Sequence, residues 1–156
     1  MWSDRTDLLQ GLSEDEAAGV RALAVPVTVP SGDILFRLGA EADHLYLVLS
    51  GRVELTLPMR IRDREEDVLL EEKQAGETLG WSGLIPPHRF TLQAKAAMES
   101  ELLAFPRAAL LAHFEANSAV GLAVMKNVAS IVGHRLQVFQ TLWLREMQRM
   151  VEMRFA

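Results

Sequence analysis

Short apolar runs separated by turn residues occupy the first two thirds of the chain, and one long helical pattern follows them. The runs are rich in Val, Leu, Ile and Phe and recur about every 8 to 12 residues, which predicts a β-sandwich or barrel. Ser50-Gly51 lies between two such runs and predicts a tight hairpin. The expected strands cover residues 25–29, 33–38, 44–49, 52–57, 67–72, 89–97 and 101–105.

Helices are expected at both ends of this β-rich region. A short helical segment is predicted near residues 4–11, and a stronger helix follows Ser13, because Ser13 and Glu16 have the spacing of a capping box. Pro106 suits the first turn of a helix that we expect to end near Ala116. Between the strands, the charged residues 59–67 predict a mobile, solvated hairpin loop.

A final helix is predicted from Asn117-Ser118 to about Arg154, because apolar residues recur there in steps of three and four. At 1.5 Å per residue it would be about 55 Å long, more than one small domain can cover. We therefore expect homodimerisation through its apolar side, while an antiparallel pair or a different protein partner stays open. Gly121 and Gly133 suggest close helix crossing or a bend. The predicted dimer interface consists of Val124, Val128, Ile131, Leu136, Phe139, Trp143, Met147 and Met150.

Composition narrows the class of protein. The chain has 156 residues, of which 49% are apolar, and this suits a single core with a domain over residues 1–116 and a continuous helix over 117–156. The sequence contains no cysteine, no leader pattern and no long apolar segment, so we expect a cytoplasmic protein without a transmembrane segment.

Charge argues against nucleic-acid binding. The net charge is −5, and residues 1–116 carry 11 Lys and Arg against 19 Asp and Glu. Nucleic-acid affinity depends largely on cationic side chains that displace counterions. We therefore expect no direct DNA binding, also because no helix-turn-helix pattern follows the long helix.

The segment GETLGWSGLIPPHRFTLQA, residues 76–94, interrupts the strands with glycines and a Pro-Pro pair. Together with residues 29–36, Gly39, residues 45–51 and Gly76-Glu77, its glycine spacing resembles that of the cyclic nucleotide-binding domain family. The resemblance is to a catabolite-activator-like sensor without its DNA-binding domain. It implies a mainly β fold with flanking helices: a double-stranded β-helix, or jelly-roll, barrel with a long C-terminal dimerisation helix.

In ligand-binding members of that family, a short helix aims backbone N–H groups at the cyclic phosphate, a carboxylate binds the ribose, and an arginine pairs with the phosphate. Here Trp81 stands where the carboxylate is expected and Phe90-Thr91 where the Arg-Ser/Thr pair is expected. Arg89 lies one residue early, and on a strand that shift turns a side chain to the opposite face. The resemblance implies an atypical ligand site made of Gly80, Trp81, Ser82, Gly83, Leu84, Arg89, Phe90 and Thr91.

These observations favour a stand-alone regulatory module that binds a cyclic nucleotide or another small anionic ligand and signals through the helix. The resemblance places the signalling hinge at residues 116–120. The alternative is a structural interaction module whose pocket is plugged by Trp81 and Phe90. The four histidines lack the spacing of a metal site, and no residue has the setting of an activated nucleophile, so we expect neither a metal nor an enzyme.

Overall fold

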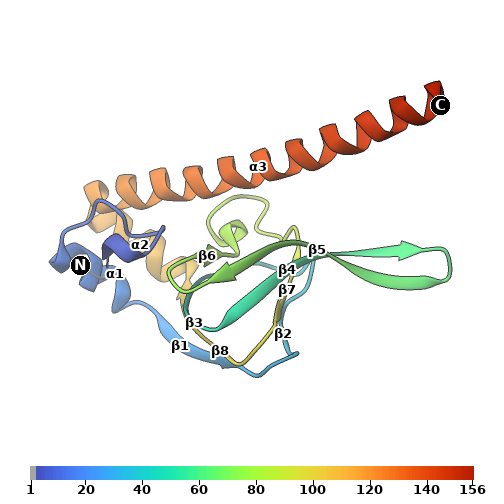
Figure 1. Ribbon diagram of the computed structural model, residues 1–156. Coiled ribbons are helices and arrows are strands. Elements are labelled where there is room, and N and C mark those ends of the chain that lie inside the picture. Colours follow the sequence, from blue (N-terminus) through green and yellow to red (C-terminus); the bar gives the residue numbers. More distant parts are fainter. Residues whose placement is uncertain (1–2) are drawn as a thin grey trace.

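The computed structural model describes residues 3–156, in which two four-stranded antiparallel sheets form a jelly-roll barrel. The strand orders are β1-β8-β3-β6 and β2-β7-β4-β5. The N-terminal α-helix and the α-helix after the last strand lie at one end of the barrel, and the long C-terminal helix runs across it (Figure 1). The strands are β1 (Val25–Val29), β2 (Ile34–Phe36), β3 (His44–Ser50), β4 (Arg52–Ile61), β5 (Arg64–Gln74), β6 (Thr78–Leu79), β7 (Gln93–Ala96) and β8 (Ser100–Pro106). The helices are η1 (Ser3–Arg5), α1 (Glu14–Arg21), η2 (Trp81–Gly83), α2 (Arg107–Ala116) and α3 (Ser118–Phe155).

Two apolar cores hold these layers together, and β3 contributes to both. Leu45 and Leu47 are buried in a core shared with the helices, whereas Val48 is buried in a second core inside the barrel, with Tyr46 packed against it. Side chains alternate between the two faces of a strand, so β3 is apolar on both sides. This explains why the run at 44–49 is nearly continuous in apolar residues.

Helix α3 packs on the barrel over its first half and continues past it. Its 38 residues correspond to about 57 Å. The side chains of Val120, Val124, Val128, Ile131 and Arg135 are buried, and the exposed large apolar residues of α3 lie mostly beyond them. Figure 1 shows the C-terminal half of α3 extending away from the barrel, on the side toward which the β4–β5 hairpin also projects.

The strand pattern is largely confirmed, and so is the cap of α1. Ser13 Oγ accepts a hydrogen bond from the Glu16 backbone N–H, while the Glu16 carboxylate accepts one from the Ser13 N–H. The short helical segment predicted near residues 4–11 is confirmed only as η1 at Ser3–Arg5, and it does not continue because Asp7 joins the following residues to the barrel. Its N–H donates to Gly76 O, and its carboxylate accepts from the N–H and hydroxyl of Thr78.

Two further boundaries differ from the prediction. Residues 59–67 are not a loop: β4 and β5 stay paired as far as Ile61 and Arg64, and the opposite charges of Arg60 and Glu65 face each other across the ladder. The strand expected at 89–97 begins only at Gln93. The residues before it form a turn that contains a cis Pro86-Pro87 bond and a positive φ at His88. The two-residue strand β6 was not predicted.

The two glycines of α3 have different surroundings, which generates a paired prediction. A Cβ at Gly121 would lie 2.8 Å from Phe114 Cβ, at the crossing of α2 and α3, whereas a Cβ at Gly133 would meet no atom within 4 Å. Gly121→Ala should lower the free energy of unfolding by about 1–3 kcal/mol through overpacking. Gly133→Ala should raise it by about 0.5–1 kcal/mol, because alanine favours a helix interior. Urea denaturation measures both, and equal effects of the same sign would contradict this assignment.

Candidate functional site

The segment that follows β6 closes one mouth of the barrel. Gly80 has a φ of +75° and leads into η2, whose Gly83 lies so close to β3 that a Cβ there would be 2.6 Å from the carbonyl oxygen of His44. A Cβ at Gly80 would lie 3.2 Å from the ring of Phe90 and 3.3 Å from that of Tyr46. Both glycines therefore make room for the chain's own side chains and backbone.

Aromatic rings fill the space inside this mouth. Phe36 and Phe90 are stacked with their centroids 3.7 Å apart and their planes at 7°, and the Tyr46 ring lies 5.9 Å from that of Phe36. Burial, with a smaller effect from the charge of Asp43, raises the pKa of Tyr46, so its hydroxyl stays neutral at physiological pH. The aromatic cluster of Phe36, Tyr46 and Phe90 is thus an uncharged core.

The cavity that remains beside the stack has a volume of about 10 Å³, which is room for about one water molecule. Pockets for ligands of ordinary size measure about 300–1,000 Å³. A cyclic nucleotide therefore does not fit beside Phe90 in this arrangement. The cavity is lined by Phe36, Leu55, Gly80, Trp81, Ser82, Phe90, Thr91, Leu92 and Arg135.

Five of the predicted ligand-binding residues, Gly80, Trp81, Ser82, Phe90 and Thr91, therefore lie together around this cavity. Gly83 and Leu84 are buried behind it, outside its lining. Arg89 lies elsewhere: it is exposed, pairs with Glu41 in an isolated β-bridge, and donates from its guanidinium to Gly39 O at 3.3 Å. Phe90 takes the inward position, so the one-residue shift removes the cation from the barrel.

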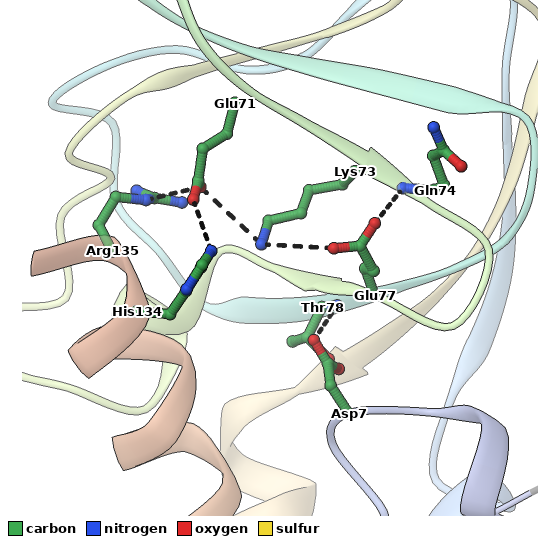
Figure 2. A network of polar contacts seen from close by, with 8 residues as sticks. All are labelled: Asp7, Glu71, Lys73, Gln74, Glu77, Thr78, His134 and Arg135. Atoms are coloured by element: carbon green, nitrogen blue, oxygen red, sulfur yellow. Dashed lines mark hydrogen bonds and ion pairs between the residues drawn. The ribbon is translucent and has the colours of Figure 1, made fainter. Parts of the chain in front are cut away.

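A different arginine, not predicted, lines the cavity. Arg135 reaches down from α3, and its Nε donates to Oε2 of Glu71 on β5 at 2.8 Å. Both side chains are about nine-tenths buried, with exposed fractions of 9% and 10%. Figure 2 shows this ion pair at the edge of a polar network that continues to His134, Lys73 and Glu77.

The predicted dimer residues fall into two groups. Val124, Val128 and Ile131 are buried in the protomer itself, with exposed fractions of 0%, 0% and 9%, so a partner cannot reach them as α3 is docked here. Leu136, Phe139, Trp143 and Met150 are 38% to 62% exposed, and Met147 is half-buried. The distal half of α3 therefore carries the accessible part of the predicted interface.

Within residues 3–156, no group of three or more His, Asp and Glu side chains is arranged to hold a metal ion. Over the same residues, no helix is long and apolar enough to cross a bilayer.

Several known proteins are similar to this chain. Glutaminase 1 of Bradyrhizobium diazoefficiens is 32% identical over 135 residues, which are 84% of this chain, and the chain spans only 20% of that enzyme's length. The N-terminal domain of a transcriptional regulator from Streptomyces coelicolor superposes with a TM-score of 0.72 at 27% identity, covering 89% of this chain and 95% of that one. The catabolite activator protein of Thermus thermophilus gives 0.75 at 26% identity, covering 92% of this chain and 63% of that one.

The cyclic nucleotide-binding domain family matches residues 26–117, which run from β1 to the end of α2 and include the whole barrel mouth. This match, the jelly-roll topology and the two structural neighbours agree. The chain therefore belongs to the cyclic nucleotide-binding domain family.

Proposed function

We propose that this chain is a regulatory domain whose barrel does not take up cyclic nucleotides and whose output is the C-terminal helix α3. The observation that carries the proposal is the stack of Phe36 on Phe90, which occupies the barrel mouth and leaves about 10 Å³. This corresponds to the alternative drawn from the sequence, with Phe36 as the partner of Phe90 in the plug.

The groups that would hold a cyclic nucleotide are also replaced. Trp81 offers an indole N–H, which cannot accept the ribose hydroxyl as a carboxylate would. The phosphate would have no arginine from this segment, because the guanidinium of Arg89 is turned to Gly39. A nucleotide would have to expel Phe90 and expose its apolar surface, which costs about 1.5–3 kcal/mol, and the arginine of the cavity, Arg135, is already paired with Glu71.

Contacts between the barrel mouth and α3 support an output through the helix. Trp81 packs at the edge of the core that includes Val124 and Val128 of α3, and Arg135 ties the same helix to Glu71. A closed mouth therefore holds α3 in one orientation. In the family, the corresponding contacts change with the ligand; here we propose that they are constitutive and present the distal helix to a partner.

A small ligand other than a cyclic nucleotide is the second candidate. The observation that favours it is that the residual cavity keeps one cation, Arg135, together with Ser82 and Thr91. A small anion that displaced Glu71 from Arg135 would be such a ligand. Thermal unfolding in the presence of inorganic phosphate or acetate tests this candidate.

The plug predicts both stability and the absence of nucleotide binding. Phe90→Ala should lower the free energy of unfolding by about 3–5 kcal/mol, because it removes a buried ring from a close-packed core. Trp81→Ala should cost less, since Trp81 is only half-buried. The matched control, Phe155→Ala, removes a ring that is 87% exposed and should change stability by less than about 0.5 kcal/mol.

With the unaltered chain, millimolar cyclic AMP or cyclic GMP should leave the thermal unfolding midpoint unchanged. A midpoint that rises with nucleotide concentration would show binding to the folded state and overturn the proposal. A rise with phosphate or acetate alone would favour the second candidate.

We propose a second copy of the chain as the partner of distal α3. The support is the side of the helix formed by Leu136, Phe139, Trp143 and Met150, which extends past the barrel and has no apolar cover within the described protomer. Two such helices can bury these side chains against each other as in a two-stranded coiled coil.

Trp143→Glu should therefore convert a dimer into a monomer in sedimentation velocity at micromolar concentration, because it places a charge in the buried seam. Thr141→Glu is the matched control: Thr141 is exposed on the opposite side of the helix, and its substitution should leave the dimer intact. A monomeric parent chain, or an equal effect of both substitutions, would contradict this arrangement.

A further inference from the structure

A second cavity lies where the N-terminal segment, the end of β5 and helix α3 meet. Its volume is about 230 Å³, and it shares no lining residue with the cavity in the barrel mouth. Asp7 and Gln10 line it from the N-terminal segment, Lys73 and Glu77 from β5 and the turn after it, and Ser130 and His134 from α3. Neither the family resemblance nor the plugged mouth accounts for this cavity.

Lys73 is the unusual member of the lining. Its side chain is only 7% exposed, yet its Nζ lies 3.8 Å from Glu71 Oε2 and 4.0 Å from Glu77 Oε2, both beyond hydrogen-bond distance. An ammonium group has three donors, and burying it is unfavourable unless those donors are satisfied. In the described chain, Glu71 is already held by Arg135 at 2.8 Å. The ammonium of Lys73 therefore lines the cavity with two long ion pairs, and neither carboxylate oxygen is within hydrogen-bond distance of it.

The carboxylates of Glu71 and Glu77 lie beside this cation, as Figure 2 shows, and Asp7 lines the same cavity. Glu77 accepts from the Gln74 N–H through Oε1, so its Oε2 remains toward Lys73. Asp7 accepts from the N–H and hydroxyl of Thr78, and each of its oxygens retains a further lone pair. One small cavity thus presents an ammonium donor and carboxylate acceptors together.

Size and charge select the class of ligand. The cavity volume of about 230 Å³ lies below the roughly 300–1,000 Å³ of pockets for drug-sized ligands, which favours a small ligand. A simple anion would face the carboxylates of Asp7 and Glu77, whereas a simple cation would face Lys73. A molecule that carries both charges avoids both repulsions.

We propose that this cavity binds a free α-amino acid. The carboxylate of the amino acid accepts hydrogen bonds from Lys73 Nζ, and its ammonium group donates to Glu77 and Asp7. The side chain of the amino acid extends toward Gln10, Ser130 and His134, whose polar groups favour a polar side chain.

Such a ligand would bridge the barrel to α3. Asn127 already links these parts, because its side-chain amide donates to the carbonyl oxygens of Leu8 at 2.8 Å and Gln10 at 2.9 Å. A bound amino acid would add contacts from Lys73 to α3 and so favour the docked helix. This consequence rests on the proposed role of α3, whereas the binding itself does not.

The test is thermal unfolding of the full chain with each of the twenty common α-amino acids at millimolar concentration, followed by calorimetric titration of those that raise the midpoint. We expect at least one polar amino acid to raise it in a concentration-dependent way. Lys73→Met should weaken binding at least tenfold by removing the ammonium. Ser130→Leu should do the same by filling the cavity from an exposed helix position, where folding is not at risk.

Thr141→Leu is the matched control, because Thr141 Oγ1 donates to a carbonyl four residues earlier on α3 just as Ser130 Oγ does, but Thr141 lies outside the cavity. It should bind like the parent chain. Absence of a midpoint change with all twenty amino acids would overturn the proposal, as would unchanged affinity in Ser130→Leu. Equal binding of the matching carboxylic acid without its amino group would overturn the pairing with Glu77 and Asp7. Because binding is measured directly, failure of dimerisation does not affect this outcome.

Discussion

The ion pair between Glu71 and Arg135 is the interaction on which the arrangement of barrel and helix depends. It joins β5 to α3 at 2.8 Å with both side chains about nine-tenths buried. Loss of Glu71 would take the carboxylate partner from the buried guanidinium of Arg135, and leaving a buried charge uncompensated typically costs about 3–5 kcal/mol. Arg135 also lines the small cavity in the barrel mouth, while Glu71 lies 3.8 Å from Lys73 in the polar cavity. One contact thus holds the helix that contributes to the lining of both cavities.

Sequence periodicity predicted most of the fold because the spacing of apolar residues along the chain reflects which side chains face a core. The run at 44–49 is apolar on both faces because β3 contributes to two cores, and Ser13 and Glu16 cap α1 through purely local contacts. The errors arise where contacts between residues far apart in the sequence determine the local structure. Asp7 accepts a hydrogen bond from Thr78, 71 positions later, and does not lie in a helix. The charges of residues 59–67 suggested a loop, because their pairing becomes visible only once the register of β4 and β5 is known.

The sequence located the barrel mouth, and it offered the plug by Trp81 and Phe90 only as an alternative, without Phe36. The glycine spacing does not say whether the space beside Gly80 takes a ligand or the ring of Phe90. That depends on Phe36, which stacks on Phe90 although the two residues are more than fifty positions apart in the sequence. The displacement of Arg89 could be suspected from its one-residue shift. Arg135 was missed although it continues the spacing of the buried apolar residues of α3. A charged residue is not expected at a buried position of a helix.

The edges of the two sheets have a consequence for how copies of the chain can meet. Of the four edge strands, β2 and β6 span three and two residues, and β1 carries Pro26, which has no N–H to donate. The long edge β5 carries the consecutive acidic residues 65–67, which would oppose the same residues of a second chain. Such edges resist the addition of further strands. The barrel is therefore unsuited to growth by pairing of strands between copies, which leaves contacts between copies to surfaces other than the sheet edges.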